Sequence, residues 1–141
     1  MSETNRTMAK KIDFLNGIGR RKSSIARIRL YRGKGASTVN GMLAEKYFEG
    51  AVALKALAKP FGITETSDKF YFTAKVLGGG KEGQLDALVL ALSRTLVKVA
   101  PEKNKILLKK LDLLTRDSRV RQRRMVGMGG KSRRKRQSPK R

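Results

Sequence analysis

The C-terminal part of this chain carries too much positive charge to fold by itself. Residues 116–141 hold 12 Lys and Arg side chains, one acid (Asp117) and few large apolar side chains. Such a segment buries too little apolar surface to offset the conformational entropy that ordering costs. The sequence therefore predicts a flexible basic tail over 116–141, a globular domain over 12–115 and a polar leader over 1–11.

The formal net charge of the whole chain is +23, from 34 Lys and Arg against 11 Asp and Glu. Self-repulsion at this density destabilises a small fold unless a polyanion neutralises it, which argues against an ordinary metabolic enzyme. Because the chain has no Cys and no His, disulfides, His-dependent catalytic triads and His-bound zinc are excluded. No apolar run could span a membrane and residues 1–11 lack a secretory signal, so we expect a cytoplasmic protein without a membrane partner.

Alternating side chains predict the strands of the globular domain. In the clearest case, small and aliphatic side chains of 24–32 face one side while Arg27, Arg29 and Tyr31 face the other. Strands are predicted over 12–18, 24–32, 37–40 and 70–77.

Helical periodicity dominates the second half of the domain. Apolar side chains spaced by three and four residues predict a central amphipathic helix over 84–100, ended by Pro101. A helix over 51–59 is predicted to stop at Pro60, which has no N–H to donate. A helical turn over 44–48 and a helix over 102–114 complete the prediction. Strands followed by helices indicate an α+β fold, a small mixed β-sheet with helices packed on one face.

Glycine-containing segments suggest nucleotide binding, but the spacing that it requires is missing. Gly17-Ile18-Gly19 would need a further glycine where Lys22 stands, and Gly130-Lys131-Ser132 would need one where Met125 stands. The acids are scattered without a catalytic pair. We expect no catalytic residue, cofactor, metal site or small-molecule substrate.

The glycines at 78–80 lie between a predicted strand and the central helix. One interpretation is a flexible turn with no further role. The other is a turn whose backbone, at Gly79 and Gly80, also docks an RNA phosphate. The sequence leaves both open.

A basic run follows the first predicted strand. Arg20, Arg21 and Lys22 stand between a glycine and the hydroxyl of Ser23, and such side chains are poor core and good phosphate ligands. Arg27 and Arg29 extend this basic surface along the next strand, where Tyr31 could stack on a base. The alternative is a charged, solvated loop.

Several of these motifs occur together, in one order, in a known protein family. The chain resembles the bacterial form of the ninth protein of the small ribosomal subunit. The matching segments are residues 17–28 (GIGRRKSSIARI), Val39-Asn40-Gly41, Tyr47-Phe48, Gly78-Gly79-Gly80 with Gly83-Gln84, residues 113–117 (LLTRD) with Arg119, and Lys140-Arg141.

The resemblance implies an α+β domain with a left-handed βαβ crossover, like the second domain of ribosomal protein S5. It also implies binding to 16S rRNA and neighbouring proteins in the head of the small subunit. The tail would reach the anticodon stem-loop of the peptidyl-site tRNA through Lys140 and Arg141. Charge and resemblance together predict rRNA contacts by Arg20, Arg21, Lys22, Ser23, Arg27, Arg29, Gly79, Gly80, Arg94, Arg116, Arg119, Arg121, Arg123, Arg124, Lys131, Arg133, Arg134, Lys135 and Arg136.

The sequence departs from the family pattern in two places. An Arg-His pair is usual where this chain has Val89 and Leu90, which leaves Arg94 as the polar residue of that segment. The family's terminal aromatic residue is also missing, and Pro139 removes an N–H next to Lys140 and Arg141.

Two other classes of protein compete with a structural ribosomal protein. A free architectural protein would bind bare DNA duplex as tightly as folded RNA. A small phosphotransferase would need metal-ligating carboxylates near a glycine loop, and Glu82 and Asp86 are the acids close to one.

Overall fold

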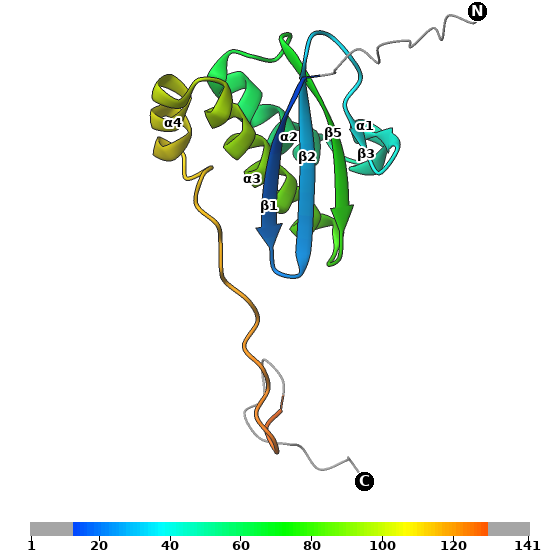
Figure 1. Cartoon of the computed structure of the whole chain (residues 1–141). Coiled ribbons are helices and arrows are strands. Elements are labelled where there is room, and N and C mark those ends of the chain that lie inside the picture. Colours follow the sequence, from blue (N-terminus) through cyan, green and yellow to red (C-terminus); the bar gives the residue numbers. More distant parts are fainter. Residues whose placement is uncertain (1–12, 130–141) are drawn as a thin grey trace, which may run out of the picture.

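The computed structural model describes residues 13–129. The predicted leader and the tail residues Lys131, Arg133, Arg134, Lys135, Arg136, Lys140 and Arg141 lie outside this range. Within it, a five-stranded sheet has its main helices on one face (Figure 1). The elements are β1 (Phe14–Arg21), β2 (Ser24–Arg32), β3 (Thr38–Val39), β4 (Met42–Leu43), α1 (Ala44–Tyr47), α2 (Ala51–Thr64), β5 (Phe70–Leu77), α3 (Lys81–Val99) and α4 (Pro101–Lys110).

The sheet has the strand order β1-β2-β5-β3-β4 and is mixed, as predicted. Among the three long strands, the central β2 runs antiparallel to both β1 and β5, whereas the short β3 pairs with β5 in parallel. β4 adds an antiparallel partner to β3 that the sequence did not predict. The predicted α+β fold is thereby confirmed.

The core lies between the three long strands and α3, which packs against β1 and β2. Leu88, Leu92 and Leu96 of α3 are completely buried, as the predicted periodicity requires. They meet the inward side chains of β2, among them Ile28 and Leu30, each only 2% exposed. Burial of such side chains supplies the main driving force for folding.

Two glycines bring β1 unusually close to α3. A Cβ atom on Gly19 would overlap the carbonyl oxygen of Ala87, and one on Gly17 would overlap the hydroxyl of Thr95. The sequence predicts that this strand ends at residue 18, between the two glycines. β1 instead continues to Arg21, since the glycines are what lets the backbones of strand and helix touch.

The prediction that α2 stops at Pro60 is wrong. The helix runs on to Thr64, although Pro60 lacks the N–H that would bond within it. Pro60 is fully buried, and the ring of Phe61 stacks on Phe72 at 6.2 Å between centroids. This packing, with the hydroxyl of Thr64 donating to the Pro60 carbonyl at 2.9 Å, compensates for the missing hydrogen bond.

α4 ends earlier than predicted, at Lys110 rather than 114. Asp112 adopts a left-handed conformation (φ 54°), and the Leu113 N–H bonds back to the Leu108 carbonyl at 3.1 Å. This pattern is the Schellman motif that terminates helices. Leu114, although not helical, still packs against the core beside Leu113.

Residues 111–129 contain no helix or strand, and Figure 1 shows them running away from the body. Leu113 and Leu114 tie the start of this segment to the core. Within residues 13–129, no helix is both long and apolar enough to cross a bilayer.

Candidate nucleic-acid interface

The sheet face opposite α3 is open to solvent and carries every second side chain of β1, β2 and β5. The strand register sets these side chains in four rows across the sheet. The rows are Arg20–Ile25–Leu77, Ile18–Arg27–Lys75, Asn16–Arg29–Thr73 and Phe14–Tyr31–Tyr71.

Aromatic rings form the last of these rows. Tyr31 stacks on Tyr71 at 5.2 Å and meets Phe14 at a tilt at 5.8 Å, so rings on both flanking strands pack against it. The guanidinium of Arg29 lies 5.0 Å from the centre of the Phe14 ring. The prediction that Tyr31 stacks on a base is therefore not supported, because its ring faces are already engaged within the sheet.

Cations form the middle of the open face. Arg27 and Lys75 stand directly opposite each other on β2 and β5, and Arg29 follows two residues along. Like charges placed opposite each other on a sheet are destabilising. None of the three is in an ion pair within the described part of the chain. This arrangement stores repulsion that an anion between the side chains would relieve.

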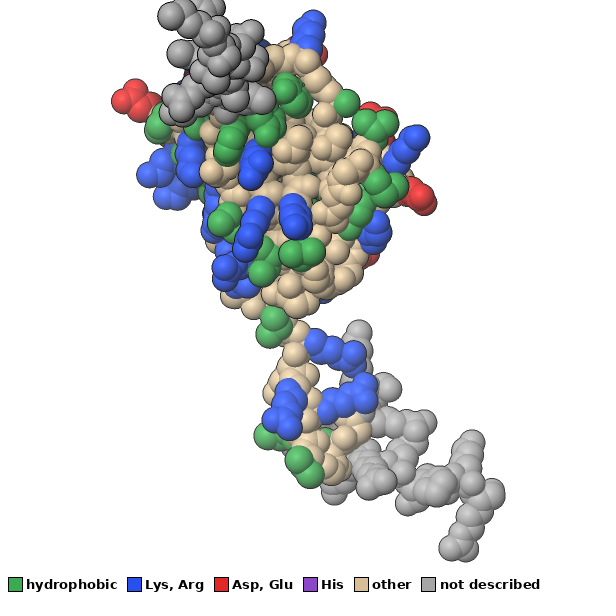
Figure 2. All heavy atoms as spheres, turned by 45° about the vertical axis from the view of Figure 1, so that its right-hand side comes forward, with side chains coloured by type: hydrophobic (Ala, Val, Ile, Leu, Met, Phe, Trp, Pro, Cys, Tyr) green, Lys and Arg blue, Asp and Glu red, His purple; other side chains and the backbone are tan. Residues whose placement is uncertain are grey.

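A hollow of about 670 Å³ lies over these cations, lined also by Asn16, Thr38 and Thr73. Hydroxyl and amide groups at its border can donate to phosphate oxygens. Figure 2 shows Lys and Arg side chains spread over the face in view and along the segment below it. Lys75 is not among the predicted RNA contacts, although the alternation of 70–77 places it on the other side of the strand from the apolar side chains.

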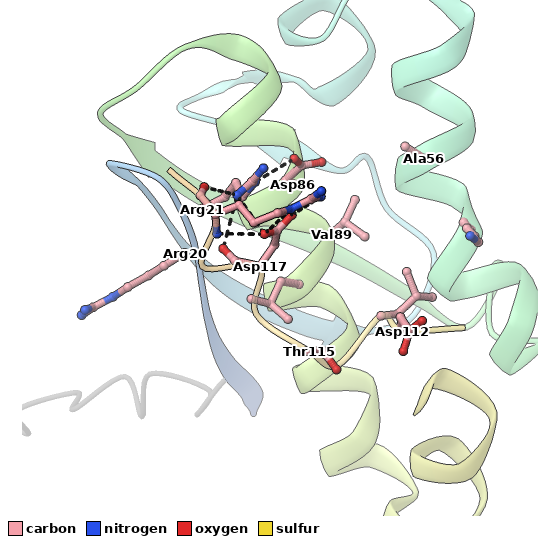
Figure 3. Close-up of a pocket in the computed structure, with 12 residues that line it drawn as sticks. Arg20, Arg21, Ala56, Asp86, Val89, Asp112, Thr115 and Asp117 are labelled. Carbon is pink, nitrogen blue, oxygen red and sulfur yellow. Dashed lines mark hydrogen bonds and ion pairs between the residues drawn. The ribbon is translucent and has the colours of Figure 1, made fainter. Parts of the chain in front are cut away.

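The hairpin between β1 and β2 presents part of the predicted basic run. Arg20, Lys22 and Ser23 are exposed, and Lys22 makes the turn with a left-handed conformation (φ 53°). Arg21 has a different position, with its side chain only 13% exposed. Figure 3 shows it turned toward Asp86 and Asp117 while Arg20 points away. Arg21 therefore does not contribute to the exposed basic surface of the hairpin.

The glycine turn after β5 packs against this hairpin. Gly78 and Gly79 both have positive φ, at 74° and 62°. A Cβ on Gly79 would overlap the hydroxyl of Ser24, which donates to the Gly78 carbonyl at 3.0 Å. Close packing thus explains Gly78 and Gly79, while Gly80 precedes α3 with no atom near its Cβ position.

Two cations of α3 lie along the outer edge of β1. Arg94 donates to the Ile18 carbonyl at 2.9 Å, and Lys98 donates to the Asn16 carbonyl at 2.8 Å. Arg94 remains exposed, so part of its guanidinium is free to meet a second partner. Lys98 joins it there, one helical turn along.

Asp117 organises the start of the C-terminal segment. Its carboxylate accepts hydrogen bonds from Nε and Nη2 of Arg119 at 3.0 and 2.8 Å, and from the Arg119 backbone N–H at 3.0 Å. The Arg119 side chain, then its N–H, and finally the charge of Arg21 hold the pKa of Asp117 well below its usual value. Asp117 thus fixes the orientation of the Arg119 guanidinium group.

The other predicted tail residues within the described range all project into solvent. They are Arg116, Arg121, Arg123 and Arg124. On α3, Val89 is half-buried and Leu90 is 6% exposed. Both line a hollow of about 430 Å³ beside Asp117 (Figure 3).

A phosphotransferase centre finds no support in this geometry. In residues 13–129 no three acidic side chains lie close enough to share a metal ion. Asp86, one of the two acids near the glycine turn, pairs with Arg21 at 3.4 Å.

The comparisons with known proteins agree with the motifs noted above. The family model described as Ribosomal protein S9/S16 matches residues 19–141. The chain belongs to the S9/S16 family.

Relatives named "Small ribosomal subunit protein uS9" share about two fifths of the aligned residues with this S9/S16 chain. One from Maridesulfovibrio salexigens is 42% identical over 84% of the chain and 90% of the relative. One from Ureaplasma parvum is 41% identical over 81% of the chain and 85% of the relative. A third, from Leifsonia xyli, is 40% identical over 79% of the chain and 66% of that longer protein.

Proposed function

We propose that this chain is a structural, non-catalytic component of the small ribosomal subunit that binds 16S rRNA in the head and acts in cytoplasmic translation. The observation that carries the proposal is the unneutralised group Arg27, Arg29 and Lys75 on the open sheet face of an S9/S16 chain. Phosphate oxygens are the ligands that such closely spaced cations favour. Phosphate contacts fix position without reading sequence, so specificity comes from the folded shape of the RNA.

The hairpin tip extends this body interface. Arg20 and Lys22 offer charge and Ser23 a hydroxyl donor, next to the backbone of Gly79 and Gly80. Arg94 adds a cation along the edge of β1, where its position beside Lys98 supports a contact with the same RNA. The chain would also meet neighbouring proteins of the head.

The C-terminal segment would thread through rRNA and end at the peptidyl-site tRNA. The exposed Arg116, Arg119, Arg121, Arg123 and Arg124 support the first part of this path. Lys131, Arg133, Arg134, Lys135 and Arg136 would continue it. Extended chain covers ~3.3 Å per residue, so Lys140 and Arg141 can reach ~70 Å beyond Arg119.

The connection from β3 through α2 to β5 belongs to the same proposal. β3 and β5 are neighbouring parallel strands, which a crossover of this kind joins. We assign it the left-handed βαβ arrangement that the resemblance implies.

Sedimentation of a cell lysate through a sucrose gradient tests the ribosomal role. We expect the protein to migrate with small subunits and whole ribosomes after a wash at ~0.5 M salt, because integration into folded rRNA resists counterion competition. Attraction by charge alone weakens steeply with salt. If the protein stays at the top of the gradient or leaves with the wash, the free architectural protein becomes the better explanation.

Deleting residues 130–141 is expected to separate the two contacts. The truncated protein keeps the sheet face and the hairpin tip, so it should enter small subunits at normal occupancy. Loss of Lys140 and Arg141, with the other tail cations, should weaken peptidyl-site tRNA binding by several-fold, because charged hydrogen bonds to phosphate are lost. Filter binding of tRNA to purified subunits measures the effect. A truncated protein that fails to enter the subunit would contradict this division.

A further inference from the structure

We infer that Arg21 is a positioning residue, which clamps the start of the basic C-terminal segment to the body and fixes the direction in which the segment leaves. Residues 115–119 are called the tail root here. All of these contacts lie within the protein, so the clamp does not require that RNA is bound.

The Arg21 guanidinium joins three parts of the chain. Its Nη1 donates to the Arg119 carbonyl at 2.8 Å and lies 3.2 Å from Asp117 Oδ1. The same nitrogen is 3.4 Å from the Asp117 carbonyl. Its Nε lies 3.4 Å from Asp86 Oδ2 on α3. Contacts that span 96 and 98 residues therefore meet in one side chain at the end of β1 (Figure 3).

Burial makes these contacts consequential. The Arg21 side chain is 13% exposed, and Nε has lost its water without gaining a well-formed hydrogen bond. A cation removed from water depends on the charges and carbonyls that replace the water. Asp86 supplies one such charge, and the tail root supplies the Asp117 carboxylate and the carbonyls of Asp117 and Arg119. If the tail root left, Arg21 would lose its best hydrogen bond and one carboxylate partner.

The tail root is shaped to receive Arg21. Asp117 is held by the side chain and the backbone N–H of Arg119, so its carboxylate has a fixed orientation. This local turn also aims the carbonyls of Asp117 and Arg119 at Nη1. The planar, forked guanidinium can satisfy a carbonyl and two carboxylates from one position. The compact ammonium of Lys cannot reproduce that set.

Two successive attachments give a chain a direction, whereas one attachment leaves a pivot. Leu113 and Leu114 are packed on the core, and Arg21 then holds Asp117 and Arg119. Beyond these attachments the chain leaves the body, beginning with Val120, which is 70% exposed. The basic segment thus starts next to the β1–β2 hairpin, which carries the exposed Arg20 and Lys22.

Distances between spin labels test the clamp in the full-length protein. The chain has no Cys, so labels can be placed only where cysteines are introduced. We choose the exposed Val52 on α2 and Val120 just beyond the tail root. We expect a narrow distance distribution with Arg21 present and a broad one in Arg21→Lys. Five released residues spread a flexible chain end over ~12 Å.

Matched controls separate the clamp from charge and from folding. Arg20→Lys makes the same chemical change at the neighbouring residue and should leave the Val52–Val120 distance distribution narrow. Asp117→Asn should broaden it, whereas Asp112→Asn, which removes the same charge from the same segment, should not. A second label pair within the body, at Val52 and Lys105, should stay narrow in every variant.

Two results would overturn the inference. One is a Val52–Val120 distribution that is already broad with Arg21 present. The other is a distribution that stays narrow in both Arg21→Lys and Asp117→Asn. If Arg21→Lys disturbs the body pair, Asp117→Asn alone decides, because Asp117 lies outside the sheet and helices.

Discussion

Replacing Arg27, Arg29 and Lys75 together by glutamine is expected to weaken rRNA binding by about two orders of magnitude at ~0.1 M salt. Each cation that neutralises a phosphate releases a counterion. Three lost contacts should therefore also reduce the steepness of the plot of log K for RNA binding against log salt concentration by about 2–3. Both quantities follow from titrating the protein into a transcript of the rRNA head domain at several salt concentrations. The variant should fold at least as well as the original chain, because the repulsion between Arg27 and Lys75 is gone.

A control with the same loss of charge makes this test specific to the sheet face. Lys105, Lys109 and Lys110 are exposed on α4, away from the open face. Their joint replacement by glutamine lowers the net charge equally and should reduce affinity far less. Equal losses in the two triple variants would mean that only total charge matters and that the open face is not the interface.

Gly19→Ala is expected to destabilise the fold by about 3 kcal/mol, at the upper end of what overpacking costs. The added methyl group would overlap the carbonyl of Ala87, which belongs to the backbone of α3 and cannot rotate away. β1 and α3 would have to separate, which loosens the core around Leu88 and Leu92. Urea denaturation of the full chain, followed by circular dichroism, measures the change.

Gly62→Ala is the matched control for that experiment. Gly62 lies inside α2, has no atom within 4 Å of its Cβ position and needs no positive φ. Alanine there should stabilise the protein by up to about 1 kcal/mol, since glycine is a poor helix former. Similar effects from the two substitutions would show that helix and strand backbones do not touch at Gly19.

Local patterns were enough to predict most of the architecture from the sequence. The alternation in β2 and β5 placed Arg27 and Arg29 on the open face, and the bounds of both strands agree with the structure. The periodicity of α3 identified its buried leucines. These features depend on neighbours a few residues apart, which a sequence displays directly.

The buried position of Arg21 could not be predicted from local sequence patterns. If the first strand ends at residue 18, its alternation says nothing about Arg21. In the longer β1, the Arg21 side chain lies on the same inward-facing side as Gly17 and Gly19. With the strand continued, Arg21 necessarily faces α3 and Arg20 faces out. Its partners at Asp117 and Arg119 are nearly a hundred residues away, and no local pattern links them. Pro60 misled the prediction for a similar reason, because distant packing outweighs its missing hydrogen bond.

The hydrogen bonds from Arg94 and Lys98 to the edge of β1 also affect self-association of the protein before RNA is bound. An outer strand with unpaired carbonyls is a template on which a second copy can add a strand and begin an aggregate. Here two of those carbonyls, at Ile18 and Asn16, are already occupied, and the occupants are positively charged. A newly made copy approaching along this edge meets cations instead of acceptors. The side chains that border the proposed RNA surface thus also disfavour the addition of a second copy at this edge.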